Sequence, residues 1–117
     1  MRQIKFRAWD KEFNEMFDWS ELLKFAPTLK AFFENEDIVK MQYTGLKDKN
    51  GREIYEGDIL TSGVMKYITG YHEHSGGWQL EVRKGEYCAE MVQSNCDLLE
   101  IIGNIYENPE LLRGDVE

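Results

Sequence analysis

The sequence predicts a mainly β domain, a β-rich α+β fold whose short strands form a sandwich or a small, partly open barrel. Segments in which apolar and polar residues alternate recur along the chain, and turn signals separate them about every ten residues. One stretch alone, residues 20–36, has extended helical character. No linker rich in proline, glycine or serine divides the 117 residues, so we expect one domain over residues 1–117.

The first 19 residues are expected to form an antiparallel hairpin. Residues 4–9 alternate with a two-residue period, which is typical of a strand that has one covered face. Residues 10–14 have the composition of a turn, and the apolar residues that follow, Met16, Phe17 and Trp19, are placed on the returning strand.

Residues 20–37 are interpreted as a helical insert. Ser20 is a suitable N-cap, because its hydroxyl can accept a hydrogen bond from a free amide of the first turn. Apolar residues follow at helical spacing. Pro27 interrupts this helix but suits the first turn of a second short helix, so the helical region is expected to continue to about residue 36.

Residues 38–113 are expected to form the barrel-like core and a terminal turn. Residues 38–43 alternate as a strand, and the Asn-Gly pair at 50–51 predicts an exposed turn. The Glu-Gly-Asp step at 56–58 indicates a tight corner before the next strand. Four further strands are expected at about 64–71, 78–82, 87–93 and 98–106. Asn108 and Pro109 then have the spacing of a cap and first position, which predicts a short helix over 109–113.

The composition limits the classes of partner. With 22 acidic and 14 basic residues, the formal charge of −8 should repel a phosphate backbone unless the basic residues gather on one face. No apolar run approaches the length that crosses a bilayer, and no signal peptide is visible. Two cysteines are too few for a disulfide scaffold, so we expect a cytoplasmic setting.

The residues that could bind a metal or act as a nucleophile form no recognised motif. His72 and His74 would point to the same side of a strand, and Cys88 and Cys96 could complete a four-ligand zinc site. The cysteines lack the usual Cys-x-x-Cys spacing, and both histidines lie in an expected hairpin loop. We therefore expect no metal and no cofactor, with His72 and His74 as weak metal candidates and the cysteines as inert thiols.

Four separated blocks of the sequence together resemble the YopX family of phage and prophage proteins. The resemblance spans nearly the whole chain, and it implies a β-rich fold encoded by a bacteriophage or an integrated prophage. It carries no catalytic residues onto this chain. The blocks are IKFRAWD at 4–10, MQYTGLKDKNG at 41–51, EIYEGDI at 53–59 and IGNIYENPELL at 102–112.

The corner at 56–58, followed by a strand, is similar to the corresponding corner of small SH3-like barrels, which bind ligands with their loops and edges. This similarity selects five candidate binding residues, although core packing and turn formation also account for them. They are Tyr43, Leu46, Lys47, Tyr55 and Asp58.

Three hypotheses for function remain open on the sequence. The leading one is a non-enzymatic phage accessory protein in the bacterial host cytoplasm, which binds a host or phage protein and self-associates through exposed strand edges. The second is a nucleic-acid-associated protein, which requires a basic face. The third is a small metal-dependent enzyme that uses His72, His74 and the cysteines or Asp58.

Overall fold

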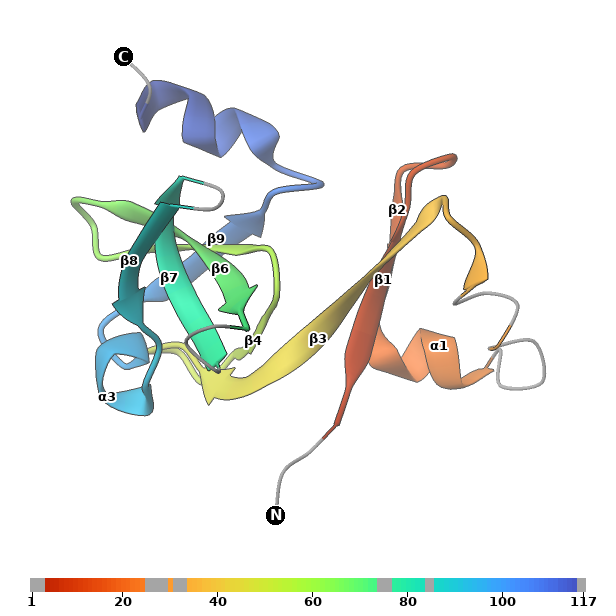
Figure 1. Ribbon diagram of the computed structural model, residues 1–117, viewed down its shortest axis with the longest axis horizontal. Coiled ribbons are helices and arrows are strands. Elements are labelled where there is room, and N and C mark those ends of the chain that lie inside the picture. Colours follow the sequence, from red (N-terminus) through yellow and green to blue (C-terminus); the bar gives the residue numbers. More distant parts are fainter. Residues whose placement is uncertain (1–3, 25–29, 31–33, 74–76, 84–85, 116–117) are drawn as a thin grey trace.

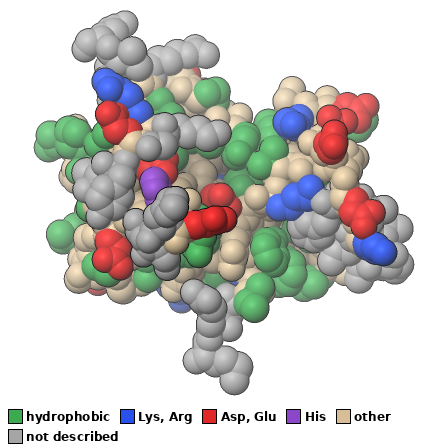
Figure 2. All heavy atoms as spheres, viewed as in Figure 1, with side chains coloured by type: hydrophobic (Ala, Val, Ile, Leu, Met, Phe, Trp, Pro, Cys, Tyr) green, Lys and Arg blue, Asp and Glu red, His purple; other side chains and the backbone are tan. Residues whose placement is uncertain are grey.

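The computed structural model describes residues 4–24, 30, 34–73, 77–83 and 86–115. Within them the fold is mainly β, with two antiparallel sheets, one of which curls into a half-barrel, and short helices (Figure 1). The expected fold class, a mainly β protein with a partly open barrel, is confirmed. Figure 2 shows acidic and basic side chains interspersed over one face of the molecule, with hydrophobic side chains along the boundary between its two parts.

The first sheet contains the expected N-terminal hairpin. Strands β1 (Phe6–Asp10) and β2 (Glu15–Phe17) are antiparallel, with Ala8 opposite Phe17. The Asp10 carboxylate accepts hydrogen bonds from the backbone amides of Glu12 and Phe13, which closes the turn. Strands β3 (Ile38–Lys47) and β4 (Glu53–Tyr55) complete the sheet in the order β2-β1-β3-β4.

The second sheet is the half-barrel, with the strand order β8-β7-β6-β5-β9. Its strands are β5 (Asp58–Thr61), β6 (Lys66–His72), β7 (Gly77–Arg83), β8 (Glu86–Glu90) and β9 (Glu100–Asn104). Each neighbouring pair is antiparallel, and the β6–β7 pair is the hairpin expected from the alternation in residues 64–82.

Strand β3 connects the two parts of the molecule. Its first half pairs with β1, whereas its second half pairs with β4, so that one strand runs from the hairpin to the half-barrel (Figure 1). Within the second half, between the pairings of Tyr43 and Lys47, Gly45 has a φ of 86° and the register with β4 shifts. The shift reorients the residues after Gly45 relative to those before it.

The two predicted glycine turns are confirmed. Gly51 has a φ of 80° after Asn50, and Gly57 has a φ of 87° at the corner between β4 and β5. The corner is also crowded, because a Cβ atom at Gly57 would lie 3.4 Å from Tyr106 and 3.5 Å from Met41. Glycine therefore permits both the backbone angle and the close approach of the two sheets at this point.

The first helix starts earlier than the sequence suggests. Helix α1 spans Trp19–Lys24, so Trp19 belongs to the helix and not to the returning strand. The cap is Asp18 instead of Ser20, since the Asp18 carboxylate accepts from the Glu21 amide and the Glu21 carboxylate accepts from the Asp18 amide. This reciprocal pair satisfies two donors where a serine would satisfy one. Lys30 and Glu34 are helical, and Pro27 lies outside the described residues.

One expected strand near the C-terminus is too long. The strand expected over 87–93 ends at Glu90, and the short helix α3 (Gln93–Cys96) follows it. The short helix expected over 109–113 is present as η2 (Pro109–Asp115), a 3-10 helix that begins at Pro109. The Asn108 side chain accepts from the Asn104 amide, and its backbone carbonyl accepts from the Leu111 amide in the first turn of η2.

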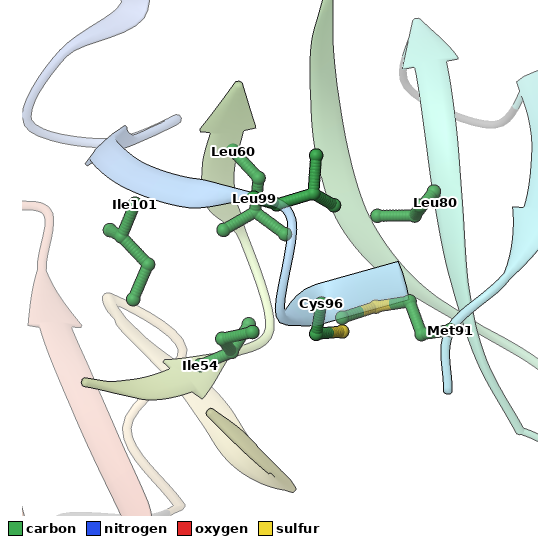
Figure 3. Close-up of a cluster of buried hydrophobic side chains, with 7 residues drawn as sticks. All are labelled: Ile54, Leu60, Leu80, Met91, Cys96, Leu99 and Ile101. Carbon is green, nitrogen blue, oxygen red and sulfur yellow. The ribbon is translucent and has the colours of Figure 1, made fainter. Parts of the chain in front are cut away.

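Of the two apolar clusters among the described residues, the half-barrel encloses the larger. Its buried members, shown in Figure 3, are Ile54, Leu60, Leu80, Met91, Cys96, Leu99 and Ile101. The smaller cluster lies beneath the first sheet, where α1 packs with Leu22 against Ala8 and Ile38. The barrel interior is thus filled by side chains.

Candidate functional site

Three of the five candidate binding residues lie together where β3, β4 and β5 meet. Tyr43 and Tyr55 are directly opposite each other on β3 and β4, and their ring centroids are 5.5 Å apart. Asp58, the first residue of β5, accepts a hydrogen bond of 2.7 Å from the Tyr55 amide. These three residues therefore form one cluster.

Two cations, Arg7 on β1 and Lys5 just before it, cover this tyrosine pair. Lys5 lies 5.4 Å from the centroid of the Tyr43 ring, and the Arg7 guanidinium lies 5.0 Å from that of Tyr55. Cations over aromatic faces at such distances are attracted by the ring quadrupole. The sequence prediction did not select Lys5 or Arg7, although their alternation in the first strand indicates that they share a face.

Arg7 and Asp58 form a largely buried ion pair between the two sheets. The Arg7 Nη2 to Asp58 Oδ1 distance is 2.7 Å, and the side chains are 14% and 2% exposed. Burial raises the pKa of Asp58, while the charge of Arg7 and the Tyr55 amide oppose that rise. Arg7 also donates to the Glu56 carbonyl at 3.3 Å, so one side chain ties β1 to the corner before β5.

The phenol groups of this cluster are weak acids. Burial, followed by the charge of Glu53, raises the pKa of Tyr55 to about 12, and the same two causes raise the pKa of Tyr43. Both phenols are therefore neutral near pH 7, and they can donate hydrogen bonds but do not act as bases.

A hollow of about 600 Å³ opens beside the cluster, and we call it the β1–β4 cleft. Its volume is twice the roughly 300 Å³ of the hollow beside His72. It combines cations, two carboxylates and aromatic rings. Its lining residues are Lys5, Arg7, Met16, Asp18, Trp19, Ser20, Arg52, Glu53 and Tyr55.

The charges in the β1–β4 cleft are partly paired. Lys5 contacts Glu53 at 2.5 Å, and Arg7 is held by Asp58. Arg52 is exposed, and its guanidinium donates to the Ile101 carbonyl at 3.4 Å. Three basic residues thus meet in one place on a chain with a net charge of −8.

The other two candidates, Leu46 and Lys47, lie away from the cleft. Leu46 packs against the half-barrel core, and Lys47 lies at the far end of β3. The side-chain amide of Gln93 both accepts from the Lys47 backbone amide and donates to its carbonyl, at 3.2 and 2.7 Å. The Gln93 side chain thus pairs with β3 as the backbone of a neighbouring strand would. Lys47 therefore has a structural role, because its backbone holds α3 against β3.

His72 lies on the half-barrel and is paired with an acid. Its Nε2 is 2.6 Å from Glu81 Oε2, and Gly70 leaves the space that the Glu81 carboxylate occupies, because a Cβ there would clash with it. His74 lies outside the described residues. Among the side chains that the structure describes, no three from His, Cys, Asp or Glu are grouped closely enough to hold a metal.

Cys96 is the cysteine whose side chain the structure describes, and its thiol is unreactive. Cys96 is fully buried on α3, and burial raises the pKa of its thiol to about 11. The thiol is therefore protonated at neutral pH, when it is a poor nucleophile. Cys88 lies on β8, and its side chain is not described. None of the helices in the described part of the chain is long and apolar enough to span a bilayer.

Comparisons with known proteins agree with this architecture. The crystal structure of protein EF1440 from Enterococcus faecalis is similar to this chain with a TM-score of 0.66 and 30% sequence identity, covering 97% of this chain and 100% of EF1440. A comparison with curated proteins gave no significant match. Residues 24–113 match the family described as YopX protein, which is most of the chain. The chain therefore belongs to the YopX family.

Proposed function

We propose that this protein is a phage or prophage accessory protein that acts in the host cytoplasm by binding another protein. The β1–β4 cleft is the proposed recognition surface. One observation carries the proposal: three basic residues and two aromatic rings line a single hollow on an otherwise acidic chain. Arginine and aromatic side chains are the residue types most enriched where binding energy concentrates in protein interfaces.

The rigidity of the cleft supports a binding role. Arg7 is fixed by Asp58 and by the face of Tyr55, and Lys5 is fixed by Glu53. Side chains that are already ordered lose little conformational entropy when a partner binds, so more of the contact energy appears as affinity. The same ion pairs occupy the groups that acid-base catalysis would need, which favours binding over catalysis.

The proposal is tested by filling the cleft at its rim. Ser20 is exposed and lines the cleft, whereas Ser94 is exposed on α3 and does not. We expect Ser20→Tyr to abolish co-purification of a specific partner from host cells, because the added ring occupies the hollow. Ser94→Tyr is the matched control and should retain the partner.

Circular dichroism should show that both variants are folded as the parent chain is. A partner that is captured equally by all three proteins would mean that recognition occurs elsewhere. A folded parent chain that captures no specific partner would contradict the binding function itself.

A further inference from the structure

Arg52 is the cation of the β1–β4 cleft whose guanidinium makes no close ion pair among the described residues, although its charge acts at longer range on Asp48 and Asp58. The other two cations of the cleft are neutralised, Lys5 by Glu53 and Arg7 by Asp58. The Arg52 guanidinium donates to the Ile101 carbonyl at the long distance of 3.4 Å. It also lines a second hollow of about 280 Å³.

The surroundings of Arg52 define what could lie against it. Tyr55, Trp19 and Met16 are half-buried and present partly apolar surfaces to the same hollow. A ligand that places one negative group on Arg52 can therefore place an apolar group beside it. A volume of about 600 Å³ is sufficient for a few side chains of a partner.

Resting on the proposed function, we infer that the β1–β4 cleft takes an acidic segment of the partner protein, with a carboxylate on Arg52 and an apolar side chain against Tyr55 and Trp19. The planar guanidinium binds a carboxylate through two parallel hydrogen bonds, which gives both strength and orientation. A nucleic acid would instead need a row of available cations along its phosphates, and two of the three here are already paired.

The inference is tested by an NMR titration of the full ¹⁵N-labelled chain. The probe is a capped six-residue peptide of alternating glutamate and leucine, and the control peptide has glutamine in place of each glutamate. We expect the glutamate peptide to shift the amide signals of the residues that line the cleft. The glutamine peptide should bind about tenfold more weakly, since it loses a charge-assisted hydrogen bond.

A pair of variants assigns the effect to Arg52. Arg52→Gln should weaken the glutamate peptide about tenfold, whereas Arg83→Gln removes an equal charge outside the cleft and should change little. Arg83 is 66% exposed and lies 3.5 Å from Glu86. Both variants should retain the dispersed spectrum of a folded chain.

The results that would contradict the acidic-segment inference can be distinguished from those that would contradict the proposed binding function. Equal binding of both peptides in the cleft, or equal affinities of the two variants, would overturn the inference and leave the proposed function standing. Shifts that occur only outside the cleft would overturn both. Shifts of the cleft signals by a six-nucleotide single-stranded DNA and not by the glutamate peptide would overturn the inference in favour of nucleic acid.

Discussion

The two parts of the molecule are stabilised in different ways. The half-barrel encloses a continuous apolar cluster of seven buried residues (Figure 3), whereas the described cluster beneath the first sheet has three. On its other face, the first sheet carries the ion pairs and cation–aromatic contacts of Lys5, Arg7, Tyr43 and Tyr55. Among the described residues, the half-barrel thus supplies most of the apolar burial, and the first sheet supplies the charged and aromatic surface of the proposed recognition site.

The joint between the parts combines a buried ion pair with aromatic and close backbone contacts. It contains the Arg7–Asp58 pair, a stacked contact of 6.1 Å between Trp9 and Tyr106, and the crowded corner at Gly57. The position of the cleft residues therefore depends on a few specific contacts. The following predictions test this difference between the two parts, from the largest expected effect to the smallest.

Shortening a side chain in each core should affect the half-barrel more. Leu60 and Leu22 are both fully buried, but Leu60 belongs to the larger cluster. We expect Leu60→Ala to lower the free energy of unfolding by about 4 kcal/mol and Leu22→Ala by about 2–3 kcal/mol, because a larger packed cluster collapses less around the cavity. Urea denaturation measures both, and a larger loss for Leu22→Ala would reverse the comparison.

Breaking the ion pair should loosen the joint. Asp58→Asn leaves the buried Arg7 guanidinium without its charge partner, and we expect a loss of about 3 kcal/mol in the free energy of unfolding. The double variant Arg7→Met with Asp58→Asn removes both charges and should recover part of this loss. Thermal unfolding of the two variants provides the measurement. If the double variant is as unstable as the single one, the charge pairing is not the cause.

Asp48 should make the protein sensitive to acid. Burial raises the pKa of Asp48, but the backbone amides of Ile101, Arg52 and Asn50 outweigh it, and the net pKa lies below the usual 3.8. Its contribution to stability is therefore present above pH 3.8 and is lost as the pH falls through the lower, folded-state pKa.

The pKa of Asp58 is shifted upward, so its carboxyl group binds a proton more tightly in the folded chain than in the unfolded chain. The effect of Asp58 on stability as the pH falls is therefore opposite in sign to that of Asp48.

We expect Asp48→Ala to cost about 2 kcal/mol at pH 7, since it leaves buried amides without an acceptor. The variant should also lose stability less steeply than the parent chain between pH 4 and pH 2. Urea denaturation at a series of pH values gives the slope, and an unchanged slope would show that Asp48 does not control it.

Two glycine substitutions should separate backbone strain from crowding at the joint. Both Gly51 and Gly57 have positive φ, but only Gly57 has neighbours within 4 Å of an added Cβ. We expect Gly51→Ala to cost about 1 kcal/mol from the backbone angle alone, and Gly57→Ala to cost more. Equal losses in thermal unfolding would mean that the corner has room to adjust.

The sequence predicted best the features that depend on neighbouring residues. The hairpin, the Asn-Gly turn and the glycine corner at Gly57 follow from local backbone preferences, and all three are present. The helix start was missed because Asp18 and Ser20 are both able to cap, and the reciprocal bond with Glu21 decides between them. Val92, a β-branched residue, made the start of α3 resemble a strand.

The candidate site was predicted only in part because its contacts join distant segments. Lys5 and Arg7 reach Glu53 and Asp58 across 48 and 51 residues, and no local pattern reveals such pairs. From the similarity to SH3-like barrels, which bind with their loops and edges, Leu46 and Lys47 were selected together with Tyr43. The bulge at Gly45 separates them, which a prediction of continuous alternation cannot anticipate.

The central claim, that the β1–β4 cleft is the surface that meets a partner, is tested most directly by site-specific photo-cross-linking in host cells. A benzophenone side chain is placed at Ser20 in the cleft or at Ser94 on α3. We expect the Ser20 position to yield a covalent adduct with one partner protein and the Ser94 position to yield none. An adduct from Ser94 and none from Ser20, with both proteins folded, would contradict the claim.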